Sequence, residues 1–199
     1  MRQTVRIALT RPLRGRGLTL VELIIVLSIF GVIATAMFLT FLVSQNSYLT
    51  NDVYIHVQQQ ARRALDSMTT ELRGAGGTVT AAGGQLTFQL ALGYNLAAPC
   101  PPNALCWGAK DQNGANQSGW SIRYRLSGTQ LVREILNGAV VQPGTRVLGN
   151  DISQLAFTYV GGATRIVTIQ LQARQVSWQL PGGAIGTGTL SARVRLRNS

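Results

Sequence analysis

One long apolar run dominates the first quarter of the chain. Residues 18–43 carry a single charged side chain, Glu22, and are otherwise apolar, small or hydroxyl-bearing. A helix of about twenty apolar residues is long enough to cross a bilayer, at about 1.5 Å per residue. No proline occurs between Pro12 and Pro99. The pattern therefore predicts a helix that continues past the end of the apolar run.

Beyond this run, apolar side chains recur at every third or fourth position. They form one stripe, which consists of Leu49, Val53, Val57, Ala61, Leu65, Met68 and Leu72. This spacing predicts an amphipathic helix, and the glycine-rich segment 74–77 predicts its end through left-handed conformations. We expect one helix over about 18–73, apolar all round in its first half and amphipathic in its second.

From about Val79 the apolar period changes to two. The alternation predicts strands near 86–90, 122–126, 131–136, 152–160, 167–171 and 190–196. The turn at 127–129 indicates that the second and third of these form a hairpin. We expect an α+β fold in which one antiparallel sheet covers the helical stripe. Segment 93–119, which is rich in alanine, proline, asparagine and glycine, and segment 180–188 are short and bounded by predicted strands, so we expect surface loops there.

The charge of the chain is strongly basic, and part of it precedes the apolar run. There are 18 basic and 7 acidic residues, and five of the basic ones are arginines in residues 1–17, which contain no acid. A basic head before an apolar run is retained in the cytoplasm and leaves the rest of the chain outside. This role accounts for the five arginines without a nucleic-acid patch. Without them, the chain keeps a net charge of +6.

The boundary between head and run reads Gly17-Leu18-Thr19-Leu20-Val21-Glu22-Leu23-Ile24-Ile25. It resembles the class III signal of type IV pilins and type II secretion pseudopilins. The resemblance implies cleavage between Gly17 and Leu18 by a prepilin peptidase, N-methylation of Leu18, and a role for Glu22 in assembly. The residue after the cut is leucine, where phenylalanine is commoner in the family. Leu39 stands where many major pilins have proline, so no kink is expected there.

Glu22 also calls for a partner on physical grounds. A carboxylate within hydrocarbon costs about 2.5–3.5 kcal/mol on insertion scales. The α-amine of Leu18 that cleavage would create, on the same molecule or on a neighbour, supplies an opposite charge. The alternative is a carboxylate at the membrane interface that extends to water or takes up a proton.

The resemblance also implies a domain organisation. Residues 1–17 would be a cleaved leader, 18–43 a transmembrane or filament-core helix, 44–75 its amphipathic continuation, and 76–199 an extracytoplasmic β-sheet domain.

Several segments are similar to the PilW-type minor pilins, and they lie at 61–76, 124–133, 152–159 and 194–198. This similarity implies a structural subunit that helps to initiate or cap a type IV pilus. Its partners would be the prepilin peptidase/methyltransferase, other minor and major pilins, and the inner-membrane assembly platform. The chain would wait in the bacterial inner membrane with its C-terminal domain in the periplasm, and would then join a pilus at the cell surface. A J-type pseudopilin of a secretion system is the alternative.

The two cysteines are Cys100 and Cys106. Outside the cytoplasm a disulfide persists, so we expect a structural bridge that closes a small loop. A metal site needs more ligands than these two and has no histidine nearby, and a redox pair more often has the spacing Cys-x-x-Cys.

Arginines alternate with apolar residues on two predicted strand regions. Arg193, Arg195 and Arg197 form one stripe, and a second is expected from Arg123, Arg125 and Arg133. Such faces either stay solvated or pair with neighbouring subunits, which we favour, or bind DNA phosphates. In the last case the chain would be a DNA-uptake or tip-binding pilin that uses this basic sheet face.

No catalytic group of residues is recognisable. The only histidine is His56, and the carboxylates Asp111, Glu134 and Asp151 are far apart in sequence. No glycine motif follows a strand in the way that nucleotide binding requires. We therefore expect neither an enzyme nor a metal or cofactor.

Overall fold

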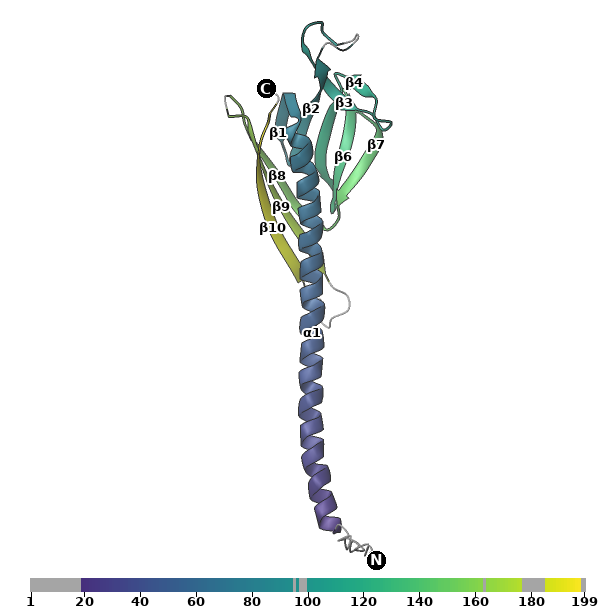
Figure 1. Ribbon diagram of the computed structural model, residues 1–199, viewed down its shortest axis with the longest axis vertical. Coiled ribbons are helices and arrows are strands. Elements are labelled where there is room, and N and C mark those ends of the chain that lie inside the picture. Colours follow the sequence, from purple (N-terminus) through teal and green to yellow (C-terminus); the bar gives the residue numbers. More distant parts are fainter. Residues whose placement is uncertain (1–18, 95, 97–99, 163, 177–184, 198–199) are drawn as a thin grey trace, which may run out of the picture. The chain divides into compact units, whose positions relative to one another are not determined.

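The computed structural model describes residues 19–94, 96, 100–162, 164–176 and 185–197 (Figure 1). Gly17 and Leu18 lie outside these residues. The chain divides into two compact units, Met1–Gln45 and Asn46–Ser199. Helix α1 spans Leu20–Arg73 and therefore has residues in both. The strands are β1 (Ala75–Ala82), β2 (Gln85–Tyr94), β3 (Leu105–Lys110), β4 (Asn116–Ser118), β5 (Ser121–Ser127), β6 (Gln130–Asn137), β7 (Val140–Gly149), β8 (Ile152–Val160), β9 (Ile166–Val176) and β10 (Ile185–Arg195).

The long helix is confirmed, and it ends at Arg73 as the pattern predicts. The expected glycine-rich stop is wrong in detail. Ala75, Gly76 and Gly77 already belong to β1, and of these only Gly77 has a positive φ, 58°. The helix passes directly into a strand because the backbone of Gly74 and Ala75 pairs at once with β2. Ala75 lies opposite Leu90, and the Ala91 amide donates to the Gly74 carbonyl.

The larger of two sheets has seven strands, in the order β4-β3-β2-β5-β6-β7 with β1 beside β2. All its pairings are antiparallel. The predicted hairpin is confirmed as β5–β6, which turns at Gly128 with φ 61°. Residues 93–119 are not a loop throughout, because β3 and β4 lie within them. Their alternation is weak in sequence because the buried positions of β3 hold small side chains, Cys106, Gly108 and Ala109.

The second sheet has three strands, in the order β10-β9-β8. The α+β fold, a long helix packed on antiparallel strands, is confirmed, but these strands form two sheets and not the one that we expected. The chain leaves the first sheet after β7 through Asp151, whose φ of 59° is left-handed, and β8 then pairs with β9. Alternation shows which side chains face inward, and it does not show which strands pair. In the view of Figure 1, β3, β6 and β7 of the larger sheet lie on one side of the second half of α1, and β8, β9 and β10 lie on the other.

The predicted loop 180–188 is corrected in part, since residues 185–188 belong to β10; residues 180–184 lie outside the described ones. Glycine in this strand reflects a close approach to the helix. A Cβ at Gly186 would lie 3.1 Å from Cγ1 of Val53 and 3.5 Å from the backbone of Tyr54. Glycine here allows strand and helix to pack closely.

One hydrophobic core joins α1 to both sheets. The helix contributes Val57, Ala61, Ala64, Met68 and Leu72, all fully or almost fully buried. This result confirms that the predicted stripe from Val57 to Leu72 faces the sheets. Phe88 and Tyr124 from the larger sheet contact each other with ring centroids 5.3 Å apart, and Ile169 and Leu171 enter from the smaller one.

Candidate functional site

The start of α1 is capped by the residue that follows Leu18. The hydroxyl oxygen of Thr19 accepts a hydrogen bond of 3.2 Å from the Glu22 amide, and its carbonyl accepts one from the Leu23 amide. Thr19 is therefore the N-cap, with Glu22 three residues later as in a capping box. The carboxylate lies in the first turn, where the positive end of the helix dipole favours negative charge.

The apolar part of α1 has no covering within the described residues. Every side chain from Thr19 to Tyr48 is exposed, and the exposed fraction is 74% at Leu20 and 67% at Phe30. Large contiguous apolar surfaces mark contact with a membrane or another protein. By length and composition, α1 is the helix of the described chain that can cross a membrane.

The hydroxyl side chains of this segment are satisfied within the helix. Ser28, Thr35 and Thr40 donate to the carbonyls of Ile24, Gly31 and Ala36, at 2.7, 2.8 and 2.9 Å. A hydroxyl bonded four residues back needs no water and no second chain. Glu22 is thus the one side chain between Leu20 and Val43 whose charge needs an external environment.

A polar clamp, which we define as Glu71, Tyr124 and Arg133, joins α1 to the larger sheet. The Tyr124 hydroxyl donates to the Glu71 carboxylate, and Arg133 donates to both of its oxygens, at 2.6 Å for the closest pair. Burial, together with the neighbouring Glu71 carboxylate, raises the pKa of Tyr124 well above its usual value. The phenol therefore remains a donor, and the clamp holds the end of the helix on β5 and β6.

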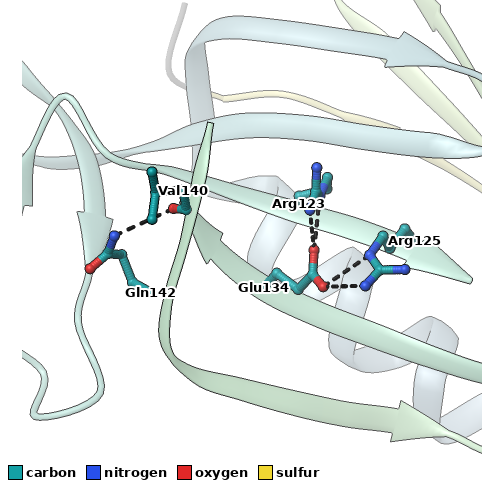
Figure 2. Close-up of polar contacts among 5 residues, drawn as sticks. All are labelled: Arg123, Arg125, Glu134, Val140 and Gln142. Carbon is teal, nitrogen blue, oxygen red and sulfur yellow. Dashed lines mark hydrogen bonds and ion pairs between the residues drawn. The ribbon is translucent and has the colours of Figure 1, made fainter. Parts of the chain in front are cut away.

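A second ion-pair cluster lies on the same hairpin and consists of Arg123, Arg125 and Glu134 (Figure 2). The Glu134 side chain, 4% exposed, accepts hydrogen bonds from Arg123 and Arg125, with closest distances of 2.6 and 2.7 Å. Hydrogen bonds from Arg125 and Arg123, against the opposing effect of burial, lower the pKa of Glu134. Both arginine side chains therefore form ion pairs with the buried Glu134 carboxylate.

The hairpin register explains these partnerships and corrects the expected second arginine stripe. Arg123 lies opposite Glu134, while Arg133 lies opposite Tyr124 and therefore on the other face. Neither Glu134 nor Glu71 was predicted as a partner of these arginines. Counting outward from the turn at Gly128 gives this register, so the signal for the Arg123–Glu134 pair was present.

The cysteines form a disulfide, with Cα atoms 5.3 Å apart. Cys100 precedes β3 and Cys106 lies within it, fully buried. The Tyr94 hydroxyl donates to the Asn103 carbonyl inside the closed loop, at 2.7 Å. The bridge and this hydrogen bond fix the loop to the ends of β2 and β3.

The other predicted arginine stripe lies at the end of β10. Arg193, Arg195 and Arg197 are exposed and alternate with buried Val194 and Leu196. With Arg73 and Arg165 they line an open cleft of about 780 Å³, which we call the arginine cleft. Arg123 and Arg125 belong to the other sheet and are not part of it.

A family model for the prokaryotic N-terminal methylation motif matches residues 13–38. No sequence among the curated proteins matches the chain. The matched segment contains Gly17, Leu18, Glu22 and most of the exposed apolar part of α1. This motif supports a type IV pilin-like protein with a pilin or pseudopilin role. It implies processing by a prepilin peptidase and association with pilins.

The architecture agrees with this class. One long N-terminal helix packs on antiparallel sheets, which is consistent with the type IV pilin fold. The apolar helix together with the methylation motif indicates a membrane-anchored protein.

Proposed function

We propose that this chain is a minor pilin, a non-catalytic subunit that helps to initiate or cap a type IV pilus. The match of residues 13–38 to the methylation motif carries the proposal. According to this proposal, the peptidase cuts after Gly17 and Leu18 is methylated. The mature chain is then held in the inner membrane until it enters the filament.

The uncovered helix and its one carboxylate support assembly through the N-terminal segment. Van der Waals packing between apolar helices supplies contact but little register. The Glu22 carboxylate supplies register, because it pairs favourably with the N-terminal amine of a neighbouring subunit and leaves a costly charge where no amine is present.

The test replaces Gly17 and Glu22 separately in the cell. Gly17→Ala is expected to abolish cleavage, so that the precursor accumulates at its full length. Glu22→Ala is expected to leave cleavage intact and to reduce surface pili strongly. Immunoblots of the precursor and mature forms, with electron microscopy of pili, give both readouts.

Matched controls lie close by in the chain. Gly15→Ala changes a glycine of the leader two residues from the cut, and Asp52→Ala removes an exposed helical carboxylate beyond the apolar run. Both are expected to process and assemble normally. Normal processing of Gly17→Ala together with normal piliation of Glu22→Ala would refute the proposal.

A pseudopilin of a type II secretion system is the second candidate, and the same motif favours it. The two differ in what is lost without the protein. A minor pilin is required for surface pili, and a pseudopilin for the export of folded proteins. Genes for other minor pilins and a tip adhesin beside this one would favour the first, and a secretion operon the second.

A further inference from the structure

The arginine cleft differs from the other arginine clusters of the described chain because it contains no acid. Arg123, Arg125 and Arg133 each pair with Glu134 or Glu71. The cleft is lined by five arginines, two threonines and three apolar residues, and none of the described residues in its lining is a carboxylate. Like charges without a partner repel one another and destabilise the folded state. A cluster of this kind is therefore typical of a functional site.

The cleft is built on fixed backbone. The Leu196 amide donates to the Arg165 carbonyl at 3.0 Å, and the Arg197 amide donates to the Arg73 carbonyl at 3.4 Å. These bonds bring three distant segments together, namely the end of α1, the start of β9 and the end of β10. The positions of the arginines therefore follow from the fold.

The cleft adjoins a free sheet edge. The order β10-β9-β8 leaves one side of β10 without a partner strand. Because the Leu196 amide points to Arg165 beside β9, the backbone groups of Ser191, Arg193 and Arg195 point the other way, toward the side on which the Arg197 amide meets Arg73, and the free part of the edge ends at Arg195. Within the described residues, no hydrogen bond reaches these outward groups.

We propose that this edge of β10 accepts an extended acidic segment of another protein subunit as an added strand. Backbone hydrogen bonds would supply affinity, as in other strand additions. Carboxylates at alternate positions of that segment would lie about 7 Å apart on one face and match Arg193 and Arg195, which alternate in the same way.

The charges select the partner. Pairing of β10 with β10 of a second copy would place arginine near arginine, which is unfavourable, whereas acid opposite arginine is favourable. The cleft lining includes no aromatic side chain for stacking nucleic-acid bases. That the partner is another filament subunit rests on the proposed function. The assay below uses no filament, so either proposal can fail without the other.

The experiment uses the full-length protein in detergent and two labelled peptides of equal composition. In one, glutamate and threonine alternate; in the other, the glutamates form a block. Fluorescence anisotropy is expected to show tighter binding of the alternating peptide, weakening with added salt. Arg195→Gln should weaken its binding by up to about fivefold. Arg174→Gln, an exposed arginine outside the cleft, should leave it unchanged.

A proline variant separates strand addition from simple charge attraction. Ser191→Pro removes an outward amide and changes no charge, and it is expected to weaken binding of the alternating peptide. Amide exchange gives an independent measurement on the unchanged protein, with protection of Ser191, Arg193 and Arg195 expected on binding, and it decides the matter where the proline variant does not fold.

Three results would overturn the proposal. Equal binding of the two peptides is one, and absence of protection at the β10 edge is another. The third is tighter binding of a DNA duplex than of the alternating peptide, with no effect of Ser191→Pro on the DNA binding. That result would identify the cleft as a binding site for DNA phosphates.

Discussion

Glu71 and Glu134 show how single carboxylates organise a basic chain. Each receives side chains from two directions: Tyr124 and Arg133 converge on Glu71, and Arg123 and Arg125 on Glu134. Glu134 is buried and Glu71 is partly buried, and a carboxylate withdrawn from water is stable only when its oxygens are satisfied. These contacts therefore fix the β5–β6 hairpin and its orientation on α1 at the level of individual atoms.

Acid should weaken the fold through Glu134. Because its pKa in the folded protein is lowered, the stabilisation is fully present above the pKa of an unfolded carboxyl, about 4, and is lost as the pH falls through the lower folded value. Glu134→Gln should lower the free energy of unfolding by about 1–3 kcal/mol at neutral pH. Urea titrations of the full chain in detergent, followed by tryptophan fluorescence, measure this difference at each pH.

The difference between wild type and Glu134→Gln should shrink below pH 4. An exposed carboxylate provides the control, since Asp66→Asn is expected to change stability little at any pH. A difference that persists unchanged into acid would contradict the assigned role of the charge.

Among the strands, the β3–β4 pair depends on one glycine. A Cβ at Gly108 would lie 2.1 Å from the carbonyl oxygen of Gln117, which is backbone and cannot rotate away. Gly108→Ala should therefore push β4 from β3 and reduce stability by about 1–3 kcal/mol. Gly161→Ala, whose nearest neighbour would be 3.7 Å away, should have little effect. Equal urea midpoints for the two variants would show that β4 adapts freely.

Gly108 also illustrates which secondary-structure elements could be predicted from the sequence. Long periodic segments were predictable: α1, β2, β5, β6, β8 and β9 follow from apolar spacing. Strands whose inward positions are small or glycine were not, as β3 and the first part of β10 show, because close approach replaces side-chain burial there. β7 was also missed, since it contains Pro143 and Gly144 and its valines at 140, 141 and 147 are exposed.

The functional residues divide in the same manner. Glu22 and the cysteines stand in local sequence patterns and could be proposed directly. The polar clamp joins Glu71 to Tyr124, which lies 53 positions later in the chain, and to Arg133, which lies 62 positions later. The arginine cleft joins the end of α1 to β10. The clamp and the cleft form only when the strands pair, so no local sequence pattern predicts them.

At the scale of the molecule, unit Asn46–Ser199 has its own core and all of the ion pairs described above. A chain that begins at Asn46 should therefore fold and remain soluble without detergent, whereas the full chain should require it. Gel filtration, with near-ultraviolet circular dichroism as a measure of packing, tests this. Aggregation of the shorter chain, or loss of its tertiary signal, would show that the first unit is needed for folding.

The internal hydrogen bonds of Ser28, Thr35 and Thr40 have a consequence for the energetics of assembly. Because these polar groups bond within the helix, their hydrogen bonds are the same whether lipid tails or neighbouring side chains surround the segment. In the proposed assembly, exchange of one apolar surrounding for another would break no hydrogen bond in this part of α1. The balance between anchored and assembled protein would then depend, in this segment, on side-chain packing and on the ionic environment of a single residue, Glu22.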